Sequence, residues 1–369
     1  MAERTESAPR EESGDGYTIR PYRPEDRAGL LALHETVFGG GDPEWFAWKY
    51  ENNPYLEEPA LFIAEHDGEV VGARPYLAYR MRAGDDTHLA LQTGDTMVHP
   101  DHRRKGLLTR MTAASFEAYA DGEPAFTFSV PNAISRPGYL RLGVELTGEL
   151  TTRYRVQDPA AFAGKGRLAR LAAPAARGYL GLLDGLYEAP LEVTVVRHAD
   201  LPAGTLAALY RRRPPEGIHA QRDEAFYGYR LGNPDWEYTA YTARLGDTPV
   251  AGVVTGERTV EGRSVTNIAE VVPLVGDDQR DRALGALLAR VIADSADSAV
   301  IAVRGSSVPA GLLRRLGFIN DRQLPLSVVA SPTVLITSPL PVDGSWRVAG
   351  RDLRNLDNWQ LTFLEQNTS

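Results

Sequence analysis

The amino-acid sequence predicts an α/β protein with two mixed-sheet domains in tandem and a short C-terminal strand extension. Two observations carry this prediction: strands and helices alternate through the first half of the chain, and several of its segments recur in the second half. The chain has 369 residues, which suits two domains of ordinary size. Hydrophobic residues make up 43% and charged residues 24% of the sequence, which excludes a largely disordered or fibrous chain.

The first domain is expected over residues 17–156, after a polar, charge-rich segment at 1–16 that is typical of a disordered tail. Its elements follow in the order β-α-β-β-β-α-β-α. The Asp67-Gly68 pair between two alternating apolar stretches predicts a tight β-hairpin. Apolar residues at helical spacing predict a helix from Leu107 to Tyr119, after a strand that runs through LQTGDTMVHP.

An internal repeat predicts the second domain, which we expect over residues 191–330 with the same fold. Residues 157–190 are predicted to form a linker helix that packs on both domains, with a helix on a membrane surface as the alternative. Residues 331–369 form the C-terminal extension, in which WQLTF is expected to be a last strand. The repeated pairs are WFAWKYENNP (45–54) with FYGYRLGNP (226–234), AEHDGEVVGA (64–73) with ARLGDTPVAGV (243–253), and YLRLGV (139–144) with LLRRLGF (312–318).

Composition and charge exclude several classes of function. There are 40 basic and 49 acidic residues, a net charge of −9, so neither a nucleic-acid partner nor a membrane surface is expected. The absence of cysteine removes disulfides, thiol nucleophiles and Cys-ligated zinc. His99, Asp101 and His102 are interpreted as loop residues, so we expect no metal. Without a signal-like start or a long apolar run, we expect a cytoplasmic location.

The stretch TMVHPDHRRKGLLTRM, from Thr96 to Met111, predicts an anion-binding site. A strand ends at Pro100, three cations follow at 103–105, and Gly106 precedes a helix. Unpaired amides at a helix start, the positive end of the helix dipole and adjacent cations together suit a phosphate or pyrophosphate. The alternative interpretation is a solvated charge run beside an ordinary helix start.

This stretch resembles the signature of the GNAT superfamily of acyl-CoA-dependent N-acyltransferases, a strand ending V-x-P followed by R/Q-x-x-G-x-G/A. Arg103, Gly106 and Leu108 stand at the three signature positions, and Leu108 departs from the usual small residue. With leucine at this position, the loop sequence HRRKGLLTRM resembles the Eis-type branch of the superfamily, whose members carry GNAT domains in tandem. The resemblance implies acetyl-CoA as co-substrate. It implies these binding residues: Thr96, Met97, Val98, Arg103, Arg104, Lys105, Gly106, Leu107, Leu108, Thr109 and Asn132.

The same resemblance supplies two candidate catalytic residues. Tyr139 lies four residues before Gly143, where the family keeps a tyrosine as general acid to the departing thiolate. Asp95 lies where the fold often places a carboxylate that serves as general base. Alternatives stay open: a core aromatic for Tyr139, a structural carboxylate for Asp95 and a turn residue for Asn132.

In Eis-type enzymes the terminal carboxylate, carried by a third domain, is thought to act as base. Only about forty residues follow the second repeat here, so this role is not transferred to Ser369.

The second domain is predicted to have lost cofactor binding. Asp277, Asp278 and Asp281 replace most of the positive charge of the loop, and Leu313 stands where the first domain has Tyr139. Gly285 is interpreted as the glycine that marks the helix start in this copy.

These observations predict an acyl-CoA-dependent N-acyltransferase in which a primary amine of a small molecule or peptide attacks acetyl-CoA directly. The aromatic segment WFAWKY is interpreted as the apolar face of a helix, with a substrate-contacting role as the alternative. Two other functions are kept: a non-catalytic acyl-CoA sensor or scaffold, and a Fem-type aminoacyl transferase. The acceptor and the oligomeric state are left open.

Overall fold

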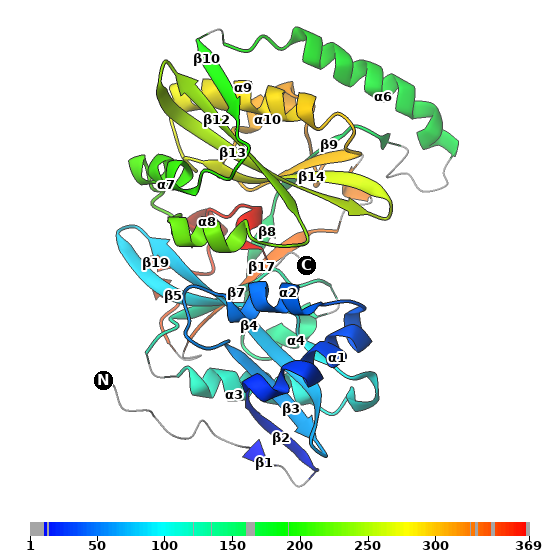
Figure 1. Cartoon of the computed structure of the whole chain (residues 1–369), viewed down its shortest axis with the longest axis vertical. Helices are drawn as coiled ribbons and strands as arrows, with labels where there is room; N and C mark the ends of the chain where they lie inside the picture. Colours follow the sequence, from blue (N-terminus) through cyan, green and yellow to red (C-terminus); the bar gives the residue numbers. More distant parts are fainter. Residues whose placement is uncertain are drawn as a thin grey trace.

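Two mixed β-sheets, each with its own helices, lie one above the other along the molecule (Figure 1). The computed structural model describes residues 11–12, 15–120, 122–133, 135–159, 167–190, 192–324, 326–328, 331–340 and 344–366. The first sheet has ten strands and the second has seven. The predicted fold class, an α/β protein with mixed-sheet domains in tandem, is confirmed.

The first sheet runs in the order β1-β2-β3-β4-β5-β7-β17-β8, with β6 and β11 paired to β4. The expected hairpin is present between β3 and β4, where Asp67 and Gly68 both have positive φ. Its strands are β1 (Glu11–Glu12), β2 (Tyr17–Pro21), β3 (Leu61–His66), β4 (Glu69–Ala83), β5 (Asp86–Thr93), β6 (Met97–Val98), β7 (Phe126–Ser129), β8 (Glu145–Leu150), β11 (His219–Ala220) and β17 (Thr333–Pro339).

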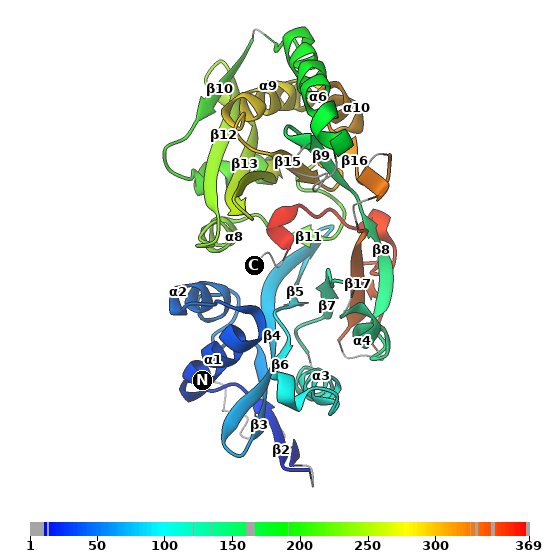
Figure 2. The ribbon, with the colours of Figure 1, turned by 90° about the vertical axis from the view of Figure 1, so that its right-hand side faces the viewer.

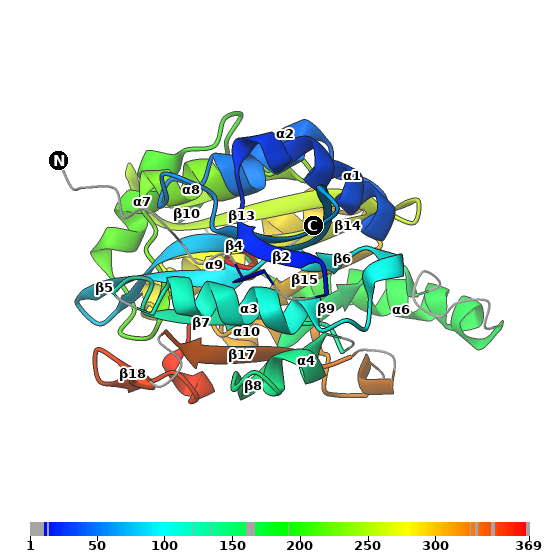
Figure 3. The ribbon, with the colours of Figure 1, turned by 90° about the horizontal axis from the view of Figure 1, so that it is seen from below.

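Helices cover both faces of this sheet. Figure 3 shows α1 (Arg27–Phe38) and α2 (Pro43–Phe46) on one side of β2 and β4, and α3 (Leu107–Ala118) on the other. The short π-helical segment η2 (Ala47–Glu51) continues α2. The helix expected from Leu107 to Tyr119 is present as α3. The disordered tail expected at 1–16 is ordered in part, because Glu11–Glu12 pairs with β2. Residues 1–10 and 13–14 of that segment lie outside the described residues.

The second sheet repeats the order of the first, as β10-β12-β13-β14-β15-β9-β16. The helices of this half are α7 (Ala203–Arg212), α8 (Glu224–Arg230), α9 (Asp278–Asp294) and α10 (Ala310–Arg315). Its strands are β9 (Thr152–Val156), β10 (Val193–Arg197), β12 (Glu237–Leu245), β13 (Thr248–Val260), β14 (Arg263–Val272), β15 (Val300–Arg304) and β16 (Ile319–Asn320).

The two halves exchange strands. β17, from the C-terminal part of the chain, lies between β7 and β8 of the first sheet, whereas β9 leaves the first half and pairs with β15 and β16. The boundaries expected at residues 156 and 331 therefore do not coincide with the edges of the sheets. WQLTF also differs from expectation: Trp359 makes an isolated bridge with Ile218, and a 3-10 turn follows at Phe363–Glu365.

The repeated aromatic segments hold the two halves together. The Trp48 indole N–H donates to the Tyr229 carbonyl at 2.6 Å, and the Tyr229 hydroxyl donates to the Lys49 carbonyl at 2.7 Å. Trp45 and Phe46 are buried in the same core cluster, which includes side chains of α7, α8 and the C-terminal segment. The segment WFAWKY is thus a core-facing helix, and the C-terminal segment lies between the two halves (Figure 2).

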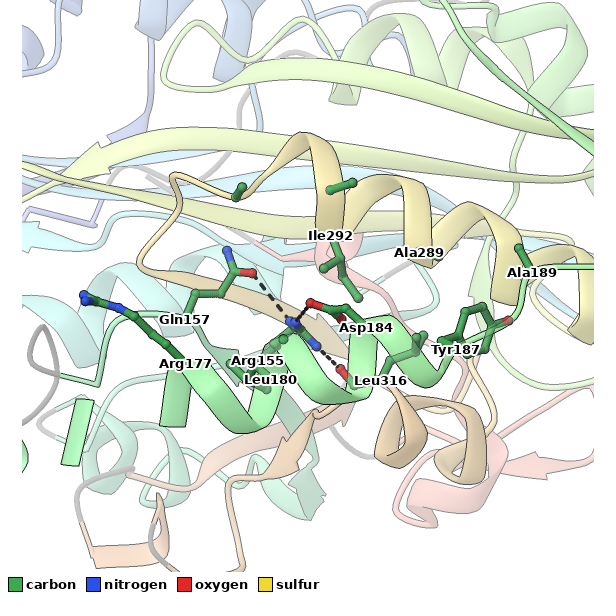
Figure 4. Close-up of a pocket in the computed structure, with 13 residues that line it drawn as sticks. Arg155, Gln157, Arg177, Leu180, Asp184, Tyr187, Ala189, Ala289, Ile292 and Leu316 are labelled. Carbon is green, nitrogen blue, oxygen red and sulfur yellow. Dashed lines mark hydrogen bonds and ion pairs between the residues drawn. The ribbon is translucent and has the colours of Figure 1, made fainter. Parts of the chain in front are cut away.

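The linker helix α6 (Arg167–Leu186) lies at the far end of the second domain, away from the first domain, rather than packing on both (Figure 1). A cavity of about 480 Å³ separates it from α9 (Figure 4). There Arg155 donates to Asp184 at 2.7 Å and to the Leu316 carbonyl at 2.5 Å. None of the helices in the described ranges, the 20-residue α6 included, has the length and hydropathy needed to cross a bilayer.

Candidate active site

A cavity of about 300 Å³ opens where two parallel strands of the first sheet separate. β5 and β7 pair from Ala90 and Phe126 to Gln92 and Phe128, and beyond this point their chains diverge. In α/β sheets, ligands bind outside the carboxyl ends of such strands. The cavity is lined by Phe38, Thr93, Gly94, Asp95, Thr96, Ser129, Val130, Pro131, Asn132, Ser135, Tyr139 and Gln366.

A break in the chain between β5 and β6 shapes this cavity. The strand expected to run through LQTGDTMVHP stops after β5 and resumes as β6, with Gly94 at the break. A Cβ on Gly94 would lie 2.9 Å from the Tyr50 hydroxyl and 3.1 Å from the Pro75 carbonyl, so a side chain there would force its surroundings apart. The interruption brings Asp95 and Thr96 to the cavity, and Gly94 is the sequence signal that could have predicted it.

Tyr139 reaches the cavity from the short helix α4 (Arg136–Leu140) and is almost completely buried. It belongs to a small apolar cluster with Val334 and Ile336 of β17, so the exchanged strand supports it. Its phenol oxygen accepts a hydrogen bond from the Arg74 guanidinium at 2.7 Å. Burial by itself raises the pKa of Tyr139, but the charge of Arg74 and several hydrogen bonds bring that pKa below its ordinary value.

Arg74 is a residue that the sequence reasoning missed. It lies on β4, is 1% exposed, and also donates to the Thr96 hydroxyl at 2.7 Å and the Tyr76 hydroxyl at 3.2 Å. The available signal was an arginine at an inward position of a strand whose neighbours, from Val71 to Tyr79, are buried.

Asp95 lines the cavity, but its carboxylate is held by an ion pair. Its carboxylate accepts a hydrogen bond from the completely buried Lys49 ammonium at 2.6 Å and another from the Tyr50 hydroxyl at 2.8 Å. Burial opposes the charged carboxylate, but Lys49 and Tyr50 outweigh it and lower the pKa of Asp95. A carboxylate stabilised in its charged form is a weak proton acceptor, so these contacts favour the structural interpretation over the general base.

Asn132 lines the same cavity but has a turn role. Its side-chain oxygen accepts hydrogen bonds from the Ser135 amide at 2.9 Å and the Ser135 hydroxyl at 3.1 Å. This is the pattern of an Asx turn, in which the side chain stabilises the bend that leads into α4.

The cationic loop ends at the start of α3, where Arg104 and Gly106 both have positive φ. Arg103, Arg104 and Lys105 are exposed, and the first amides of α3 have no acceptor within the helix. Leu108, in the first turn of α3, lies beside α4, since its Cδ2 is 3.4 Å from the position of a Cβ on Gly138. Of the other candidate binding residues, Met97 and Val98 form β6, Leu107 is buried in the core and Thr109 is exposed.

In the second domain, a carboxylate of the chain itself caps the corresponding helix start. Asp277 caps α9 by accepting a hydrogen bond from the Arg280 amide at 3.1 Å. The interpretation of Gly285 as the start of this helix is wrong, because α9 begins at Asp278. Gly285 lies inside the helix, where a Cβ would fall 1.9 Å from the Tyr187 hydroxyl. Across the described ranges, no group of three or more His, Cys, Asp or Glu side chains is arranged to hold a metal ion.

Comparison with known proteins agrees with this geometry. Residues 18–147 match the family model described as "Acetyltransferase (GNAT) domain". This part of the chain is therefore a GNAT acetyltransferase domain, and it contains β5, β7, the cationic loop and Tyr139. No curated protein gave a match to the sequence.

Solved structures show that the tandem fold extends over most of the chain. A GCN5-related N-acetyltransferase from Anabaena variabilis has a TM-score of 0.61 at 12% identity, with 88% of this chain and 73% of that chain covered. A probable N-acyltransferase from Enterococcus faecalis gives a TM-score of 0.63 at 12% identity and the same coverage. Eis1 from Mycobacterium abscessus gives a TM-score of 0.53 at 14% identity, covering 89% of this chain and 74% of that chain.

Proposed function

We propose that the protein is an acyl-CoA-dependent N-acyltransferase that moves an acetyl group from acetyl-CoA to a primary amine. The observation that carries this proposal is that, within a GNAT domain, a buried tyrosine lines a cavity between diverging strands and is carried by a short helix that lies beside Leu108, at the cationic start of α3. The amine belongs to a small molecule or a peptide. It enters past Phe38, which is 52% exposed at the cavity.

The donor set of the loop fits the pyrophosphate of acetyl-CoA. Arg103, Arg104 and Lys105 supply positive charge, and the amides from Arg104 to Thr109 lie at the positive end of the α3 dipole. Thr96, Met97 and Val98 would meet the pantetheine arm along the broken strand. Asn132 would sit beside that arm, with its turn role unchanged. Acetyl-CoA brings to this site a thioester that an amine can attack directly.

In the proposed mechanism the chain contributes positioning and one proton transfer. The C–N bond forms as the C–S bond breaks, and the Tyr139 hydroxyl donates its proton to the departing sulfur. The proton released by the attacking nitrogen restores the phenol through solvent. Asp95, paired with Lys49, holds the broken strand in place rather than accepting the proton of the amine.

Thermal unfolding with and without acetyl-CoA tests this proposal. Ligand at about 100 times its dissociation constant adds roughly 2.7 kcal/mol of stability. We expect this increase in the wild-type protein and a much smaller one in Arg104→Glu. Arg282→Glu is the matched control, because Arg282 lies in the first turns of α9 in the second domain and should not alter the increase.

Turnover separates an enzyme from a sensor. With acetyl-CoA and a panel of amines, Tyr139→Phe should lose most of the rate while keeping the stability increase. If wild-type protein binds acetyl-CoA but acetylates no amine in the panel, the sensor function replaces this proposal. If no acyl-CoA alters its stability, the acyltransferase proposal fails.

A further inference from the structure

We propose that Arg74 is a positioning residue for Tyr139: its buried guanidinium fixes the phenol oxygen and stabilises the tyrosinate that remains after proton donation. The role of Arg74 in catalysis rests on the proposed function. The contact between the two side chains can be tested without any substrate.

The geometry joins the two side chains in two ways. An Arg74 Nη1 hydrogen bond reaches the Tyr139 oxygen at 2.7 Å, and the guanidinium carbon lies 4.8 Å from the centroid of the Tyr139 ring. The same Nη1 atom donates to the Thr96 hydroxyl at 2.7 Å, so the guanidinium spans from α4 to the broken strand. These contacts hold the phenol oxygen at the cavity wall.

The charge of Arg74 is unbalanced in the resting protein. None of the ion pairs found in the described ranges includes Arg74, and its hydrogen-bond acceptors are the hydroxyls of Tyr139, Thr96 and Tyr76. A buried cation without an anion is costly, because water no longer solvates it. Ionisation of Tyr139 would supply that anion in direct contact with Arg74, so the protein favours the ionised phenol more than water does.

Other charged groups near the phenol do not cancel this effect. Asp95 lines the same cavity, but Lys49 neutralises it. β17 and α3 meet the Tyr139 cluster through the apolar side chains of Val334, Ile336 and Phe116.

The charged side chains near Tyr139 in sequence lie closer to water. Arg136 is half-buried, and Arg141 and Glu145 are exposed. The lowered pKa of Tyr139, in which Arg74 opposes the effect of burial, agrees with this arrangement.

The chemical consequence concerns the moment at which the thiolate leaves. The Tyr139 proton passes to sulfur as the C–S bond breaks, and the negative charge that appears on the phenol oxygen meets a cation already in place. Because no group has to move to accommodate that charge, the proton transfer has a lower barrier. The proton lost by the amine nitrogen then returns to the phenol, so charge and protons balance over the cycle.

Spectroscopic titration of the free protein tests the coupling. Tyrosinate absorbs in the ultraviolet at longer wavelength than tyrosine, and the difference between wild type and Tyr139→Phe isolates this one phenol. We expect a midpoint below the ordinary value of about 10 in wild type. In Arg74→Gln we expect it about one unit or more higher, and in Arg80→Gln, which removes an exposed arginine of the same strand, unchanged. A wild-type midpoint at or above 10 overturns the proposal even if Arg74→Gln fails to fold.

Steady-state kinetics then tests whether Arg74 contributes to the rate of acetyl transfer. We expect Arg74→Gln to lower kcat about 10- to 100-fold with little change in KM for acetyl-CoA, and Arg74→Lys to recover part of the loss. An unchanged kcat pH profile in a folded Arg74→Gln variant overturns the positioning role. If the titration midpoint moves as expected but wild type acetylates no amine, the contact stands and the proposed function is what fails.

Discussion

The ion pair between Lys49 and Asp95 gives the sharpest prediction about the site. Lys49 is completely buried, the Asp95 side chain is 12% exposed, and their charged atoms are 2.6 Å apart. Removing one partner leaves the other as an uncompensated charge that is largely buried, which costs about 3–5 kcal/mol of unfolding free energy. Replacing both partners removes that penalty. We therefore expect Asp95→Asn and Lys49→Met each to be strongly destabilised, and the double variant to be more stable than either.

Urea unfolding of the four proteins forms a double-mutant cycle that measures the coupling directly. The matched control is Arg27→Met, which breaks the ion pair with Glu51 at 2.9 Å, where the side chains are 35% and 31% exposed. That variant should lose no more than about 1 kcal/mol. Single Lys49 and Asp95 variants that stay within about 1 kcal/mol of wild type would refute the reasoning.

The same double variant decides what Asp95 does in catalysis. If Asp95 is a positioning carboxylate, the folded double variant keeps most of the acetyl-transfer rate, because Tyr50 can still donate to an asparagine oxygen at position 95. A loss of more than about 100-fold, with acetyl-CoA binding intact, would instead make Asp95 the general base.

Three further predictions concern stability. Burial raises the pKa of Glu270 from 4.5 to about 7, so the folded protein binds more protons than the unfolded chain between these values. The stability that Glu270 contributes is therefore lost as pH rises through that window, and Glu270→Gln should flatten the pH dependence of urea unfolding. A Cβ on Gly305 would lie 2.3 Å from the Leu361 carbonyl, so Gly305→Ala should lose stability and displace the C-terminal segment. Gly262→Ala, with positive φ but open space, should lose only about 1–2 kcal/mol; equal losses would contradict the clash. Gly181→Ala, on an open face of α6, should raise the thermal midpoint by adding about 0.5–1 kcal/mol, and a lower midpoint would contradict this.

Features that depend on short windows of residues could be predicted from the sequence alone. The 3.6-residue spacing fixed the helix from Leu107, the Asp67-Gly68 pair fixed a hairpin, and the repeat of WFAWKYENNP in FYGYRLGNP fixed the tandem fold. The helix and the hairpin follow from residues close in sequence, where local backbone preference and apolar spacing suffice, and the repeat is found by comparing one short segment with another.

Contacts between distant segments, in contrast, are set by tertiary packing. The sequences of β17 and β9 are those of ordinary strands. Each pairs with a strand of the opposite half that lies more than 100 residues away along the chain, so its position follows from packing. The same holds for the contacts of Arg74 with Tyr139 and of Lys49 with Asp95, which join residues 65 and 46 positions apart. A buried charge has no periodic signature, because its position is set by the partner that neutralises it and not by its neighbours in sequence.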